Sequence, residues 1–285
     1  MTKGCVRLPG LRDQLSAAAR QLEVVAERPR FEAEMLWGHV LGLSRAGLIA
    51  ADDDVLTPER IAFAENLVER RSRGEPMAYL VGRRGFWTLD LSVTPDTLVP
   101  RPETEGLVEW ALESIPASGV WNIADLGTGT GAIALAVASE RPKSRVVATD
   151  ASLHAMAVAC GNAKRLALSN VEFRAGDWCE ALDRTVAFDL ILSNPPYIAE
   201  GDPHLADLSF EPLTALVSGV DGLDAIRTIV CQARDHLRAG GLLRLEHGAD
   251  QAESVRNLLK RAGYIDVETR PDLSGHERMT GARKP

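Results

Sequence analysis

Cysteines are few in this sequence, and long apolar runs are absent. The four cysteines, Cys5, Cys160, Cys179 and Cys231, lie far apart without a Cys-x-x-Cys pair, so neither a zinc knuckle nor a redox dithiol nor any metal site is predicted. We expect free thiols that are mostly buried. No stretch approaches the roughly 18 to 20 apolar residues of a membrane span, and residues 1–30 lack an uninterrupted signal-peptide core. A cytoplasmic protein without membrane association is predicted.

Basic residues are also in deficit, and the deficit lies in one part of the chain. The 285 residues include 32 Lys and Arg against 40 Asp and Glu, a formal net charge of −8. The first 90 residues contain 13 basic and 13 acidic residues, so the whole −8 lies beyond them. Such an excess repels polyanions at long range, which argues against direct nucleic-acid binding by phosphate neutralisation alone, although a local basic groove is not excluded.

The apolar pattern divides the chain, whose 45% hydrophobic residues suffice for two domains. Apolar residues recur three and four apart over 11–74, where Thr57 and Pro58 are typical of a helix start and Gly74 of a stop. We therefore predict a bundle of four or five helices over 1–76. Alternation near 85–93 and several prolines predict a β-hairpin and linker over 77–102.

From residue 103 onward, a helix over about 103–114 precedes short β-rich runs that alternate with helical stretches. The predicted strands are 121–126, 145–150, 171–175, 188–193, 242–246 and 265–269. This alternation is typical of an α/β fold with a doubly wound, mostly parallel sheet. Ligands of such sheets bind at the carboxyl ends of the strands, so the residues that follow each strand are the candidates for chemistry.

A glycine-rich turn follows the first of these strands. Gly127, Thr128, Gly129, Thr130 and Gly131 come between the strand and a helix, where glycines let the backbone approach a ligand closely. The second strand ends in Asp150, whose carboxylate can accept both hydroxyls of a ribose. The pattern predicts a nucleoside-containing cofactor. It does not separate NAD from S-adenosylmethionine, because Gly127, Gly129 and Ala132 also satisfy the dinucleotide spacing.

The fourth strand runs into Asn194, Pro195, Pro196 and Tyr197. Two prolines stiffen this loop, aim the Asn194 amide and leave backbone carbonyls as acceptors, while the ring of Tyr197 can cover a planar group. The motif therefore predicts a slot for a planar NH₂ group beside the cofactor. We expect the Asn194 side-chain oxygen and the Pro195 carbonyl to accept the two hydrogens of this group and to orient its nitrogen.

Several blocks together resemble the protein glutamine N5-methyltransferases of class I peptide chain release factors, the HemK or PrmC family. The resemblance covers about residue 79 to the C-terminus, and the N-terminal region matches in character more than in residues. Its blocks, beside the Asn-Pro-Pro-Tyr and glycine-rich motifs, are 98–105, 176–178, 210–216 and 245–248. Arg101, Glu103, Glu105, Glu211, Glu246 and His247 lie in these blocks, but nothing in the sequence assigns them a role.

The resemblance implies the Rossmann-like fold of a class I S-adenosylmethionine-dependent methyltransferase. It implies that the glycine-rich turn wraps the methionine part of the cofactor, that Asp150 takes the ribose, and that Trp178 lies by the adenine. Residues 194–197 hold the substrate, with Asn194 also beside the cofactor. The implied reaction transfers the methyl group to the glutamine of the Gly-Gly-Gln motif in class I release factors, modulates translation termination, and leaves S-adenosylhomocysteine.

Other substrates fit parts of the same pattern. A ribosomal-protein glutamine methyltransferase has the same build. An N6-adenine nucleic-acid methyltransferase presents the same planar amino group on a flipped base, but that function favours a basic face. An NAD-dependent oxidoreductase or a nucleotide-binding domain leaves the residues from Asn194 to Tyr197 unexplained.

Overall fold

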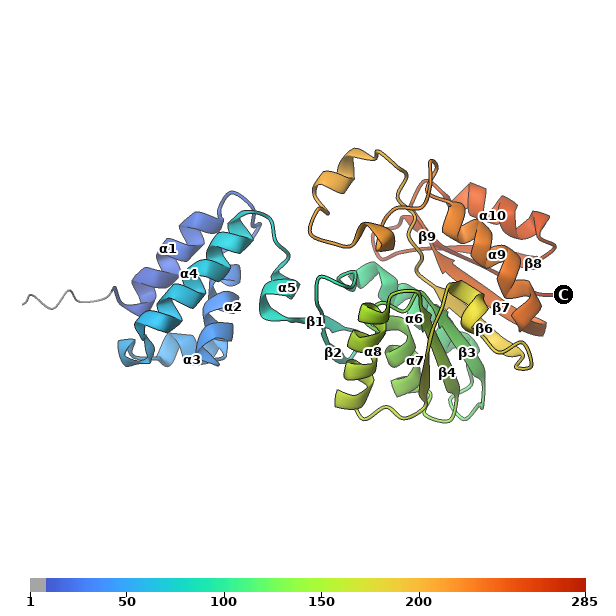
Figure 1. The fold of residues 1–285 in the computed structure, drawn as a ribbon, viewed down its shortest axis with the longest axis horizontal. Helices are drawn as coiled ribbons and strands as arrows, with labels where there is room; N and C mark the ends of the chain where they lie inside the picture. The colour runs from blue at the N-terminus through green and yellow to red at the C-terminus, as the bar shows by residue number, and fades with distance from the viewer. Residues whose placement is uncertain (1–8) are drawn as a thin grey trace, which may run out of the picture. The chain divides into compact units, whose positions relative to one another are not determined.

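The computed structural model describes residues 9–285, so Cys5 lies outside the described residues. The chain divides into two compact units on either side of the bond between Gly82 and Arg83 (Figure 1). Each unit has a hydrophobic core of its own. No helix among the described residues is long and apolar enough to cross a membrane.

The first unit is a helical bundle, as the apolar spacing predicts. Its helices are α1 (Leu11–Leu22), α2 (Pro29–Leu41), α3 (Arg45–Ala50), α4 (Pro58–Ser72) and α5 (Met77–Val81), with a 3₁₀ turn at Asp53–Val55. The predicted helix start is confirmed, because the Thr57 hydroxyl accepts the Arg60 N–H at 3.3 Å and Pro58 occupies the first helical position. Gly74 follows the end of α4 with φ +99°, a conformation that favours glycine.

The second unit begins with the predicted hairpin and continues into a sheet of seven strands. The hairpin pairs β1 (Arg83–Phe86) with β2 (Leu89–Ser92). The sheet order is β5-β4-β3-β6-β7-β9-β8. Strand β9 is antiparallel to both of its neighbours, β7 and β8, and the other neighbouring strands are parallel. The strand bounds are β3 (Asn122–Leu126), β4 (Arg145–Asp150), β5 (Val171–Ala175), β6 (Phe188–Ser193), β7 (Leu237–Glu246), β8 (Ile265–Pro271) and β9 (Glu277–Arg283).

Helices cover both faces of this sheet, which confirms the predicted fold class. Figure 1 shows α7 and α8 on one side of the sheet and α9 and α10 on the other. Alternate strand residues point to opposite faces of the sheet. Ile123 packs into one core cluster, and its neighbour Ala124 packs into the other. The helix bounds are α6 (Glu105–Ser114), α7 (Ala132–Glu140), α8 (Leu153–Arg165), α9 (Asp224–His236) and α10 (Ala252–Arg261).

Several details differ from the sequence-based expectations. Residues 77–81, which were expected in the hairpin and linker, form helix α5, and the first unit extends to Gly82. Strand β7 begins at Leu237, and β9 was not expected, because its polar and small residues lack a clear alternation. A 3₁₀ turn at Pro102–Thr104 precedes α6, so the helix begins two residues later than expected. The expectation of mostly buried thiols is wrong among the described cysteines: Cys179 is buried, but Cys160 and Cys231 lie on the exposed faces of α8 and α9.

Candidate functional site

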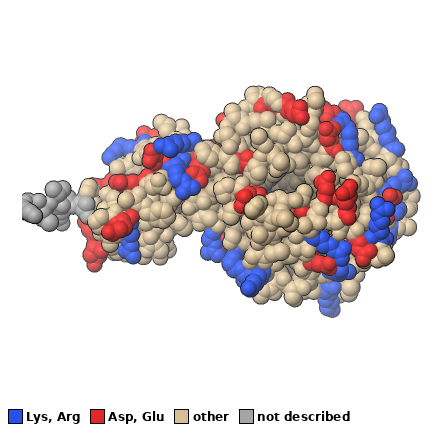
Figure 2. All heavy atoms as spheres, viewed as in Figure 1, with Lys and Arg blue, Asp and Glu red and all other residues tan. Residues whose placement is uncertain are grey.

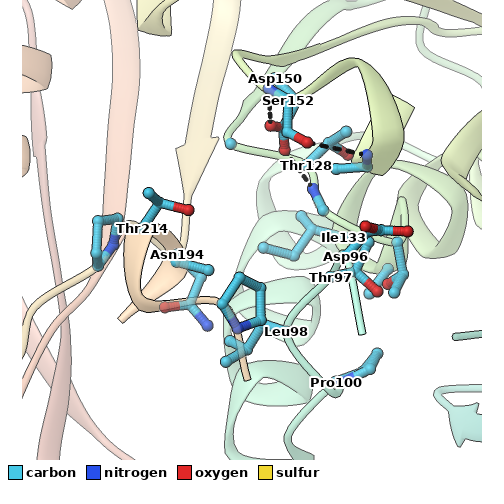
Figure 3. Close-up of a pocket in the computed structure, with 18 of the residues that line it drawn as sticks. Asp96, Thr97, Leu98, Pro100, Thr128, Ile133, Asp150, Ser152, Asn194 and Thr214 are labelled. Carbon is cyan, nitrogen blue, oxygen red and sulfur yellow. Dashed lines mark hydrogen bonds between the residues drawn. The ribbon is translucent and has the colours of Figure 1, made fainter. Parts of the chain in front are cut away.

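A cavity of about 490 Å³ opens at the carboxyl ends of β3, β4, β5 and β6. This volume lies within the range of about 300 to 1,000 Å³ that is usual for small-molecule sites. Figure 3 shows Asp150, Ser152 and Thr128 on one side of the cavity and Asn194 and Thr214 on the other. The cavity brings together most of the predicted cofactor residues, namely Gly127, Thr128, Gly129, Thr130, Asp150, Trp178 and Asn194.

The glycine-rich turn has backbone conformations that favour glycine. Gly127, Gly129 and Gly131 have φ values of +70°, +56° and +85°. A Cβ at Gly127 would lie 3.1 Å from the Trp178 ring, and one at Gly131 would lie 2.9 Å from Leu135. Gly131 is not part of the cavity wall; it is the N-cap of α7, so it directs the chain from the turn into the helix.

The Asp150 carboxylate holds the wall of the cavity together. Its Oδ2 accepts the Gly129 N–H at 2.9 Å, and its Oδ1 accepts the Ser152 N–H at 2.8 Å (Figure 3). Each carboxylate oxygen has a second lone pair. Asp150 therefore braces the glycine-rich turn and can still accept hydroxyl groups of a ligand.

Trp178 forms another part of the cavity wall. It follows β5 with φ +44°, and its backbone carbonyl accepts the Thr149 hydroxyl at 3.1 Å. The ring packs over Gly127 and against the core cluster beneath α9. A side chain at position 127 would crowd this ring.

The loop from Asn194 to Tyr197 lies between two cavities. Asn194 and Pro196 line the large cavity, and all four residues of the loop line an adjoining cavity of about 250 Å³. The Asn194 amide nitrogen donates to the Thr104 hydroxyl at 3.0 Å. This bond engages the nitrogen and leaves the amide oxygen as the acceptor at the site.

Tyr197 is uncharged at neutral pH. Burial raises the pKa of its phenol to about 12, and the nearby Glu246 raises it further. Its backbone carbonyl accepts the Gln251 side-chain amide at 2.9 Å, which fixes the end of the loop. A neutral aromatic ring therefore lines the adjoining cavity.

Sequence reasoning gave no role to Asp125, the second-last residue of β3, which lies two positions before the glycine-rich turn. It is 1% exposed, and its Oδ2 accepts the Thr128 hydroxyl at 2.6 Å and the Ala134 N–H at 3.1 Å. Among the described residues, no donor reaches its Oδ1. Burial raises the pKa of Asp125 to about 7, and the charge of Asp150 adds to this rise. Its position ahead of the glycines was the available signal.

The residues that the sequence left without a role have contacts in the structure. Glu105 accepts the Trp87 N–H at 2.8 Å, which ties the hairpin to α6. His247 is buried between the Gly248 carbonyl and the Thr280 hydroxyl, and burial lowers its pKa, so its ring is neutral. Glu103 lies in the 3₁₀ turn at Pro102–Thr104.

Arg101 and Glu211 form an ion pair that joins two loops of the cavity wall. The buried Glu211 carboxylate pairs with Arg101 and also accepts the Val99 N–H at 2.9 Å. The first loop contributes Leu98 and Pro100 to the large cavity, and the second contributes the residues after Glu211. The signal for these residues was their place in the blocks 98–105 and 210–216.

Glu211→Gln is expected to lower the free energy of unfolding by about 1 to 3 kcal/mol and to raise KM for the substrate severalfold. A glutamine offers one acceptor oxygen, so either Arg101 or the buried Val99 N–H loses its partner. Urea unfolding and steady-state kinetics measure the two effects. Glu113→Gln is the matched control, because the exposed Glu113 pairs with Arg270 and such surface pairs contribute little. Equal effects of the two substitutions contradict the prediction.

Comparisons with known proteins agree with this geometry. Residues 13–82 match the family model of the PrmC N-terminal domain, and residues 109–208 match that of the methyltransferase small domain. A methyltransferase structure from Pyrococcus furiosus shares the fold, with 21% identity and a TM-score of 0.53 over 77% of this chain and 98% of that one.

Curated relatives match nearly the whole chain. The release factor glutamine methyltransferase of Xylella fastidiosa strain Temecula1 is 50% identical over 273 residues, which are 95% of this chain and 97% of that protein. The Escherichia coli K12 protein of the same name is 48% identical over 271 residues, 94% of this chain and 97% of that protein. The resemblance found in the motifs is confirmed: this chain belongs to the release factor glutamine methyltransferase family.

Proposed function

We propose that this protein transfers a methyl group from S-adenosylmethionine to the side-chain nitrogen of the glutamine in the Gly-Gly-Gln motif of class I release factors. The observation that carries the proposal is one cavity, with the Asp150-braced glycine turn on one side and the Asn194 amide on the other. The first side suits a nucleoside and the second suits a planar amide. Membership of the family names the substrate.

The residues of the first side fit S-adenosylmethionine. Asp150 has acceptor capacity for the ribose hydroxyls. Gly127 and Gly129 keep the backbone open for the methionine part, and the Trp178 ring offers a flat surface to the adenine. When bound, this group supplies a methyl that its sulfonium already activates.

The residues of the second side position the acceptor nitrogen. A glutamine amide is a poor nucleophile, because its nitrogen lone pair is delocalised into the carbonyl. The Asn194 side-chain oxygen and the Pro195 carbonyl accept the two amide hydrogens, and the neutral ring of Tyr197 stacks on the amide plane. These acceptors favour the positive charge that grows on the nitrogen, in the manner of an oxyanion hole with the signs reversed. The proton leaves after transfer, so no dedicated base is required.

A nucleic-acid amino group is the main competing substrate. The excess of acidic residues beyond residue 90 disfavours it. On the face drawn in Figure 2, Lys and Arg side chains of the second unit form separate groups mostly along its edge, with Asp and Glu between them. A basic face suited to a phosphate backbone is not seen in that view.

An incorporation assay tests the proposal. The purified protein is incubated with methyl-labelled S-adenosylmethionine and, in separate samples, with release factor, ribosomal protein and DNA. We expect label in the release factor alone, and none after its Gly-Gly-Gln glutamine is changed to alanine. Label in DNA or ribosomal protein, with none in the release factor, overturns the proposal.

We further propose that the helical bundle docks the release factor. Exposed apolar side chains on its surface, Val24, Ile49 and Phe63, are available for a protein contact. Deletion of residues 1–82 is expected to lower kcat/KM for intact release factor by about tenfold or more, a loss of about 1.4 kcal/mol of binding. The two units have separate cores, so Kd for S-adenosylmethionine should not change.

A short Gly-Gly-Gln peptide is the control substrate for this deletion, because it is too small to reach a separate docking surface. Its kcat/KM should be the same for the full chain and the shortened one. Unchanged methylation of the intact factor, or an equal loss with the peptide, contradicts a docking role for the bundle.

A further inference from the structure

Glu246 is a buried carboxyl group beside the proposed amide site that the mechanism above does not use. It is 1% exposed at the end of β7, and among the described residues no donor reaches its Oε2. Burial of an ionised carboxylate costs free energy unless neighbouring groups stabilise its charge. Its neighbours therefore indicate what the carboxyl group does.

The sheet register places Glu246 next to Asn194. Strands β6 and β7 are parallel, and Ser193, the last residue of β6, pairs with Leu245. Asn194, which directly follows β6, therefore lies at about the level of Glu246, the last residue of β7. Side chains alternate along a strand, and residues at the same level point to the same face. Asn194 and Glu246 are thus neighbours on one face, at the edge of the sheet where the cavity opens.

Thr104 completes a group of three side chains. Its hydroxyl is buried and accepts a hydrogen from the Asn194 amide nitrogen at 3.0 Å. Both side chains also lie close enough to the Glu246 carboxyl group to lower its pKa. An ionised carboxylate can only accept hydrogen bonds, so it favours donors on the side chains that face it, namely the Thr104 hydroxyl and the second amide hydrogen of Asn194.

This arrangement permits one orientation of the Asn194 amide. The reverse orientation would place Oδ1 against the Glu246 oxygens, two acceptors without a hydrogen between them. We propose that Glu246 is a positioning residue, which holds the Asn194 nitrogen toward the sheet so that Oδ1 faces the substrate amide. The role in catalysis rests on the proposed function, whereas the orientation itself does not require a substrate.

The charge state of Glu246 makes this orientation sensitive to pH. Burial raises the pKa of Glu246 to about 7, while Thr104, Arg278 and Asn194 lower it and Glu103 raises it. The facing Tyr197 stays neutral, because its own pKa is about 12. A protonated Glu246 becomes a donor as well as an acceptor, and it no longer excludes the reverse orientation of the Asn194 amide. Activity should therefore fall as the pH drops through about 7.

A double-mutant cycle tests whether Glu246 acts through Asn194. Glu246→Ala should lower kcat about tenfold, or about 1.4 kcal/mol, with Kd for S-adenosylmethionine unchanged. In an Asn194→Ala background, the same substitution should change kcat by less than about twofold, because the group it positions is gone. Additive losses overturn the proposal and leave the proposed function standing.

Glu246→Gln is the control that separates loss of the charge from loss of the fold. The glutamine keeps the shape and one acceptor oxygen, so we expect a loss of about threefold in kcat. Activity should fall less than in the wild type as the pH drops through about 7, where the buried Asp125 still titrates. Glu172→Gln, on the exposed face of β5, should keep the wild-type pH profile. A profile of Glu246→Gln that matches the wild type contradicts the proposal.

A second readout needs no substrate. The ¹⁵N side-chain amide signal of Asn194, assigned by its loss in Asn194→Ala, should shift with a midpoint near the pKa of Glu246, about 7. The same signal should stay constant in Glu246→Gln. This result stands whether or not the release factor is the substrate, and a wild-type signal that does not move overturns the proposal.

Discussion

Replacing Asn194 by alanine lowers kcat for methylation of the release factor about 10²- to 10³-fold, while Kd for S-adenosylmethionine changes less than about threefold. The physical reason is the position of the residue. The Asn194 side chain lies across the cavity from the glycine-rich turn, with its nitrogen bound to Thr104, so its oxygen serves the acceptor amide. Loss of an acceptor for charge that develops during transfer affects the rate more than the binding of the methyl donor.

Single-turnover kinetics with saturating donor, together with calorimetric Kd values, separate these effects. Asn122→Ala is the control. The Asn122 side chain also donates a hydrogen bond, to a backbone carbonyl, but Asn122 lies at the amino end of β3, away from the cavity. The control should retain the wild-type kcat. An Asn194→Ala enzyme with normal turnover would exclude Asn194 from the amide site.

The sequence was sufficient for the parts of the site that are local in the chain. The glycine turn, Asp150 and the Asn194 loop each follow a strand, and a strand followed by special residues can be recognised in a single stretch of sequence. Because parallel strands bring their carboxyl ends to one edge, these separate stretches could be expected to meet. The large cavity contains Gly127, Asp150 and Asn194 together.

The parts that could not be predicted depend on contacts between distant residues. The Glu211 carboxylate reaches Val99 and Arg101, more than 100 positions away in the chain, and no spacing rule encodes that pairing. Glu246 lies beside Asn194 only through the register of β6 and β7, which a single sequence does not specify. Motif blocks indicated that such residues matter, but only the fold supplies their partners.

Asp150→Ala is expected to raise Kd for S-adenosylmethionine about 100-fold, since a hydrogen bond to a charged group contributes about 1.5 to 3 kcal/mol. The carboxylate has two tasks: it accepts the ribose hydroxyls in our proposal, and it holds the Gly129 and Ser152 N–H groups at 2.9 and 2.8 Å. At saturating donor, kcat should fall less than about tenfold, because Asn194 and its neighbours remain in place.

Asp189→Ala is the control for a general loss of stability. Asp189 likewise accepts a backbone N–H, that of Asn122 at 2.8 Å, and it pairs with Arg238, but it lies at the amino end of β6, away from the cavity. If the effect of Asp150→Ala came from a general loss of stability, both substitutions would lower stability and would change Kd for the donor to a similar extent. Titration calorimetry should instead give a weakened Kd for Asp150→Ala alone. An unchanged Kd would show that Asp150 does not bind the ribose and would leave it the role of holding the Gly129 and Ser152 N–H groups.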